Sequence, residues 1–195
     1  MFAEAPSKGG FFHFLERMGV LSISGIAIGM AVLGLWIAIW STQEKVRLSH
    51  GVGQIVQVVS LSRELALSYP YLGNNGHEDL LAALHRVQRL PEAREVEGVF
   101  ALDNPWDGML FAVTIPDQMM RVETIVPPRT CRRIVDIFAE NPSTLGVLRI
   151  EVKGWEQPWK TVYAADENLA FDDKFISDVC QSAARAQVSL RLKLR

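Results

Sequence analysis

The sequence has 195 residues, with 20 Lys and Arg against 22 Asp and Glu, which gives a formal net charge of −2. No basic block or tail accompanies this near-neutral balance, so we expect no nucleic-acid partner. The two cysteines and four histidines follow no metal-ligand or catalytic-triad spacing, so we also expect no bound metal, no cofactor and no enzymatic activity.

The longest apolar segment begins close to the amino terminus. No charged residue occurs between Met18 and Gln43, and the run from Met18 to Trp40 contains 23 residues. A helix of about 20 apolar residues spans the roughly 30 Å hydrocarbon core of a bilayer. We therefore expect a transmembrane helix over 11–43. A buried core helix or a secretory signal is the alternative, but the run exceeds a usual signal length and no A-x-A-like cleavage site follows it.

Helical spacing of apolar residues continues past this segment. It predicts a helical extension over 44–69 that enters a globular head formed by residues 70–195. Gly51 and Gly53 interrupt the extension. Because a glycine in a helix interior costs up to about 1 kcal/mol, we expect a kink or local melting there.

The head is predicted to combine helices with antiparallel strands. Helical spacing favours helices over 78–90 and 130–142, the second capped by Thr130. Alternation of apolar and polar residues predicts strands over 109–115, 119–126, 147–152, 160–164 and 187–195. The connections are of hairpin length, which favours an antiparallel sheet. The predicted fold class is α+β, with a long N-terminal transmembrane helix packed on a small antiparallel sheet.

Both cysteines, Cys131 and Cys180, fall in segments that we expect to be structured. A single disulfide is the simplest hypothesis. Closing a loop of about 50 residues stabilises a domain by roughly 3 to 4 kcal/mol, provided that the compartment is oxidising. A disulfide would place the head outside the cytoplasm. The alternative is two buried free thiols, as in cytosolic domains.

Several short motifs follow one another in a characteristic order. A polar leader, SKGG, precedes FFHFLE; an apolar helix, a helical extension and a short helix follow; then come the turn NPWDG, the segment VPPRTC and a cysteine shortly before the last strand. In this order the motifs resemble a type IV prepilin of the type IVb class, similar to the pilins of conjugative thin pili and secretion-type pili. The resemblance implies the type IV pilin fold and a structural role.

The resemblance also implies how the amino terminus is processed. A prepilin peptidase would remove a leader of residues 1–10 by cutting after Gly10, leaving Phe11 as a new terminus that is usually methylated. Glu16 would pair with this terminus in the neighbouring subunit and set the register of assembly. The family places its glutamate fifth after the cut, whereas Glu16 is sixth from Phe11, so a cut one residue later stays open. A solvated pair with Arg17 is the alternative role for Glu16.

Self-association into a filament for conjugation, secretion or attachment is the implied function. The implied partners are the prepilin peptidase, the assembly ATPase and platform protein, and the inner membrane. The head would lie in the periplasm before assembly and on an extracellular pilus afterwards. A minor pilin or pseudopilin, and an uncleaved single-pass membrane protein with a periplasmic sensor or binding head, are the alternatives.

Overall fold

The computed structural model describes residues 9–72, 76–154, 157–165, 172–181 and 184–194, with side chains from residue 34 onward except 37 and 173. The chain divides into two compact units, Met1–Val46 and Arg47–Arg195. Helix α1, Gly9–Ser68, contributes residues to both. The sheet and all other described helices belong to the second unit.

The predicted fold class is wrong in its membrane element. Within the described residues, no helix combines the length and the apolar character needed to cross a bilayer. In the part of α1 whose side chains are described, the apolar stretch is short because Glu44, Lys45 and Arg47 follow soon after Trp40. The long N-terminal transmembrane helix that we predicted over 11–43 is therefore not shown by the described residues.

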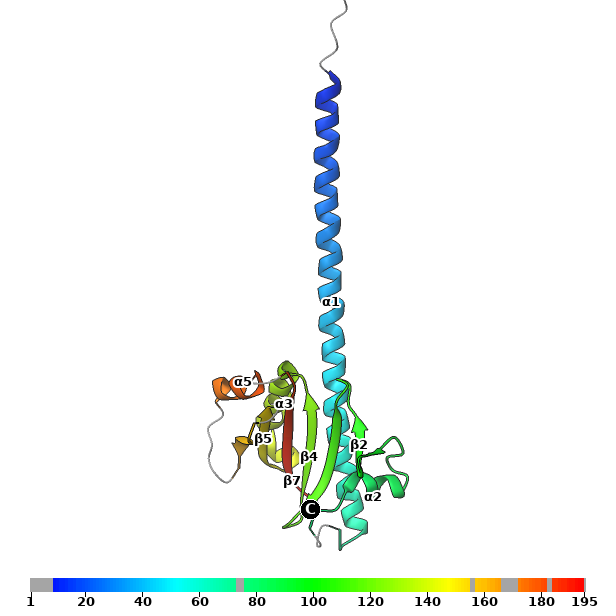
Figure 1. Cartoon of the computed structure of the whole chain (residues 1–195), viewed down its shortest axis with the longest axis vertical. Helices are drawn as coiled ribbons and strands as arrows, with labels where there is room; N and C mark the ends of the chain where they lie inside the picture. The colour runs from blue at the N-terminus through cyan, green and yellow to red at the C-terminus, as the bar shows by residue number, and fades with distance from the viewer. Residues whose placement is uncertain (1–8, 73–75, 155–156, 166–171, 182–183, 195) are drawn as a thin grey trace, which may run out of the picture. The chain divides into compact units, whose positions relative to one another are not determined.

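The second unit is built on a seven-stranded sheet in which neighbouring strands are antiparallel, in the order β1-β2-β3-β4-β7-β5-β6 (Figure 1). The strands are β1 Arg94–Val96, β2 Val99–Asp103, β3 Met109–Ile115, β4 Met119–Val126, β5 Val147–Gly154, β6 Lys160–Ala164 and β7 Ala186–Lys193. The sheet is larger than the small one predicted, because a hairpin of β1 and β2 extends it. Glu97 and Gly98 form the turn of this hairpin at positive φ.

Four shorter helices complete the described fold: α2 Leu80–Arg86, α3 Pro128–Glu140, α4 Pro142–Leu145 and α5 Asp173–Gln181. Asp79 caps α2 by accepting a hydrogen bond from the Ala82 N–H at 3.0 Å. The predicted cap of α3 is wrong. Pro127 occupies the cap position, and Thr130 is buried within the first turn, because a proline suits the first helical positions and lets the helix begin earlier.

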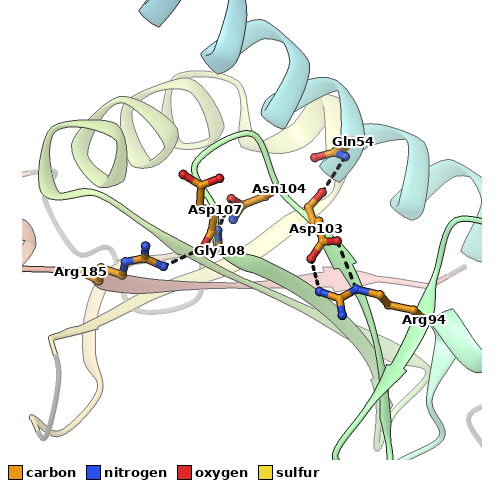
Figure 2. Close-up of polar contacts among 7 residues, drawn as sticks. All are labelled: Gln54, Arg94, Asp103, Asn104, Asp107, Gly108 and Arg185. Carbon is orange, nitrogen blue, oxygen red and sulfur yellow. Dashed lines mark hydrogen bonds and ion pairs between the residues drawn. The ribbon is translucent and has the colours of Figure 1, made fainter.

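One face of the sheet forms the core. The predicted alternation of β7 is confirmed for Val188, Leu190 and Leu192, which are buried and lie opposite buried residues of β4 and β5. These strands belong to one apolar cluster with residues of α1 and α3, so both helices cover the same face (Figure 2). Figure 1 shows α3 and α5 toward the β5 end of the sheet and α2 toward the β2 end.

Helix α1 is continuous through Gly51 and Gly53, so the helix does not melt there, which was one of the two outcomes predicted. Gly51 is instead a close-packing position. A Cβ atom added there would lie 2.3 Å from Cη2 of Trp106, whereas one added at Gly53 would meet nothing within 4 Å. The missing side chain of Gly51 thus gives the indole of Trp106 room against the helix.

Candidate functional site

Among the described histidines and acidic residues, His85 and Asp172 make structural contacts. No group of three or more His, Cys, Asp or Glu side chains in the described residues is arranged to hold a metal ion. His85 packs against Phe100, with the ring centroids 5.2 Å apart. Asp172 accepts backbone N–H bonds from Lys174 and Phe175 and so caps α5.

The turn formed by residues 103–108, here called the Asn104 turn, is held by one buried side chain. Nδ2 of Asn104 donates to the Ile125 carbonyl at 2.7 Å and to Oγ1 of Thr124 at 3.1 Å. Its Oδ1 accepts the backbone N–H groups of Trp106 and Gly108, both at 3.0 Å. The amide therefore fixes the turn on β4 and holds Trp106 against α1.

Further polar contacts join the Asn104 turn to other elements (Figure 2). Gln54 of α1 donates to the Asp103 carbonyl at 3.2 Å, and Arg185 donates to the Asp107 carbonyl at 2.8 Å. Arg94 makes two hydrogen bonds to the Asp103 carboxylate, at 2.7 and 3.1 Å. These bonds lower the pKa of Asp103 and raise that of Arg94. The turn thus joins the part of α1 that belongs to the second unit to the sheet of that unit.

The predicted disulfide is confirmed. Cys131 in α3 and Cys180 in α5 are bonded, with their Cα atoms 5.8 Å apart. Both are fully buried, so the bridge holds the two helices together within the core. The three other predicted site residues, Gly10, Phe11 and Glu16, have their backbone in α1, and their side chains lie outside the described residues.

The part of α1 that precedes the second unit exposes large apolar side chains. Leu35, Trp36, Ile39 and Trp40 recur at helical spacing, and Trp36 is 69 % exposed. We call these four residues the α1 stripe. A monomeric soluble protein rarely exposes such a contiguous apolar surface, which normally marks an interaction site. The stripe is the strongest indication of an interface in the described chain.

A groove lies between the end of α1 and α2 in the second unit. It encloses about 370 Å³ and is lined by Leu65, Tyr69, Tyr71, Leu72, Glu78, Ala83, Arg86 and Val87. A lining of aromatic and apolar groups with two charged side chains suits a small-molecule or peptide ligand. Sequence reasoning missed the groove, because its lining comes from the end of α1, the residues that follow it and α2, which only the fold brings together.

Comparisons with known proteins do not indicate what the chain does. No family model, no curated protein and no solved structure matches the chain. The function is therefore argued from the chain's own residues: the α1 stripe, the globular second unit and its disulfide.

Proposed function

We propose that this chain is a structural subunit that is processed after Gly10 and polymerises into a filament similar to a type IVb pilus. The single observation that carries the proposal is the α1 stripe. Fully burying a side chain of this size contributes about 1.5 to 3 kcal/mol relative to leaving it in water. Four such side chains on one helix favour association with apolar surface of other copies.

Helix α1 links the stripe to the head along one continuous element. The residues Ile55, Val58 and Val59 of α1 are buried in the core of the second unit, and Gly51 packs beneath Trp106. Association of the stripes would therefore bring the heads of neighbouring copies together, as a filament subunit needs.

Processing and location belong to the same proposal. The peptidase removes residues 1–10, Phe11 becomes the amino terminus, and Glu16 of a neighbouring copy pairs with the new amine. An assembly ATPase and a platform protein supply the energy and the geometry of polymerisation. The buried disulfide supports an oxidising surrounding for the head, such as the periplasm and then the cell exterior.

The proposal is tested by placing a charge within the stripe. Ile39→Glu should abolish filaments recovered from cells that contain the matching peptidase and assembly proteins, because a carboxylate would be buried between copies. Ser41→Glu adds the same charge at an exposed position on the opposite face of the same helix and is the matched control. Wild-type cells without filaments, or Ile39→Glu cells with normal filaments, would refute the proposal.

The groove beside α2 favours a second candidate, an unprocessed protein whose head binds a ligand. Its aromatic lining and charged margin are suited to an apolar ligand with one polar group. This candidate requires neither processing nor polymerisation. An intact amino terminus together with ligand-dependent protection of the head would favour it over the filament subunit.

A further inference from the structure

The groove between the end of α1 and α2 adjoins a second, smaller hollow of the same unit. The groove encloses about 370 Å³ and the hollow about 190 Å³. Leu65, Tyr69 and Val87 line both, so the two lie next to each other. Tyr69 and Val87 are exposed, and the wall that they form is therefore open to solvent. We call the groove and the hollow together the double groove.

Four charged side chains line the double groove, and three of them are already engaged. Glu64 and Arg89 form an ion pair at 2.8 Å, and Glu78 makes a contact of its own. Arg86 is exposed and forms no ion pair within the described part of the chain. The double groove thus suits an occupant that carries two adjacent apolar groups and one carboxylate beside them.

The α1 stripe carries such a set of groups. Trp36 and Trp40 lie four positions apart in α1, and their side chains are 69 % and 54 % exposed. Residues at this spacing are neighbours on one helix face, with about 5 to 6 Å between their Cβ atoms. Glu44 is exposed, follows Trp40 at the same spacing, and is the only carboxylate between residues 34 and 46 of the sequence. Two indoles and one carboxylate therefore form a row.

The size of this row fits the double groove. The larger groove lies within the range of about 300 to 1,000 Å³ that is usual for pockets holding aromatic ligands. Each indole buries about 150 to 250 Å², so the two would remove about 300 to 500 Å² of one partner from water. A standard stable interface buries about 800 Å² per partner. The contact is thus too small to hold two isolated copies together, and it gains strength only by repetition in an assembly.

We propose that Trp36 and Trp40 of one copy insert into the double groove of another copy. Trp40 occupies the larger groove, where Glu44 pairs with Arg86, and Trp36 occupies the smaller hollow. The contact joins two different surfaces of the chain, so it is heterologous, and a heterologous contact that does not close into a ring generates an open assembly. The inference rests on the proposed function, because it names the apolar surface on which the α1 stripe is buried in the filament.

Cross-linking between two single-cysteine variants tests the contact directly. Glu44→Cys and Arg86→Cys chains are co-expressed with the peptidase and the assembly proteins, and their filaments are treated with a short bismaleimide. The two native cysteines are bonded to each other and buried, so they do not react. Because each variant carries one new thiol, a link between the two variants joins two copies, and mass spectrometry identifies it. Ser41→Cys lies on the opposite face of α1 and, paired with Arg86→Cys, should give no link.

Charge reversal supplies an independent readout. Arg86→Glu places a carboxylate against Glu44 and should lower the filament yield up to about fivefold at low salt, as expected for one exposed ion pair. Adding Glu44→Arg to the same chain should restore the yield, because the pair forms again with opposite polarity. This rescue would not occur if Arg86→Glu only impaired folding. Arg133→Glu makes the same charge change at an exposed position of α3 and should leave the yield unchanged.

The outcomes separate this inference from the proposed function. Filaments that show the link between Glu44→Cys and Arg86→Cys, together with rescue by Glu44→Arg, support both. Filaments without the link and without rescue overturn the inference and leave the filament subunit intact. Binding of anilinonaphthalene sulfonate, an apolar anion, to intact filaments that is lost in Arg86→Glu would show an unfilled groove and would also overturn the inference. Absence of wild-type filaments refutes the proposed function, and the inference falls with it.

Discussion

Two glycines of α1 provide a matched pair of substitutions. Gly51 and Gly53 lie two residues apart in the same helix, and alanine improves helix propensity at either position by about 1 kcal/mol. They differ in their surroundings. A Cβ at Gly53 meets nothing within 4 Å, whereas a Cβ at Gly51 lies 2.3 Å from Cη2 and 2.4 Å from Cζ3 of Trp106.

The expected magnitude follows from this difference. Non-bonded carbons prefer separations of about 3.5 to 4.0 Å, so the indole must retreat by more than about 1 Å to admit a methyl group at position 51. Overpacking of this kind costs about 1 to 3 kcal/mol. Gly53→Ala should therefore stabilise the protein by up to about 1 kcal/mol, and Gly51→Ala should be about 1 to 3 kcal/mol less stable than Gly53→Ala.

Urea unfolding of the full chain, followed by circular dichroism, measures both variants. Repeating the pair in a Trp106→Leu background assigns the cost, because the difference between the two alanines should shrink when the indole is absent. Equal stability of Gly51→Ala and Gly53→Ala in the wild-type background would refute the reasoning and leave the glycine at position 51 without a packing role.

Three further predictions concern the stability of the head. Asn104→Ala removes four hydrogen bonds of a buried side chain and should lower the free energy of unfolding in urea by about 2 to 4 kcal/mol. The exposed Asn141→Ala is the control and should change the free energy of unfolding by less than about 0.5 kcal/mol. Equal effects of the two substitutions would contradict the conclusion that the Asn104 side chain holds the turn. Reducing the disulfide should lower the free energy of unfolding by roughly 3 to 4 kcal/mol, and an unchanged denaturation midpoint in reductant would show that the bridge does not stabilise the fold. Because Arg94 lowers the pKa of Asp103 below its ordinary value of 3.8, the stabilisation from this pair is complete above that value and is lost as the pH falls through the lower folded pKa. The stability difference between wild type and Asp103→Asn should thus vanish in acid; a difference that persists at low pH would exclude the ion pair as its source.

The sequence predicted those elements whose pattern is local and repeated. The bounds of β3 and β4 match the predicted strands, because their apolar residues alternate over seven and eight positions. The β1–β2 hairpin was missed because β1 has only three residues, too few for a period to be visible. Its one local signal is the pair Glu97 and Gly98, which suits a two-residue turn.

Features that depend on pairing between distant segments were beyond sequence reasoning. Gly51 and Gly53 were both interpreted as points of flexibility, and only the fold shows that one of them contacts Trp106. The row of Arg121, Arg191 and Arg149 across β4, β7 and β5 depends on the register of three strands that are far apart in the chain. The disulfide was predictable because a chain with two cysteines in structured segments allows a single pairing.

The central claim, a processed filament subunit, is tested most directly by the intact mass of the mature protein from cells that contain the matching prepilin peptidase. The account predicts a chain that has lost residues 1–10 and begins at Phe11, with or without a methyl group. A start at Phe12 would also show processing and would make Glu16 the fifth residue. A chain that still begins at Met1 in the presence of active peptidase would contradict the account.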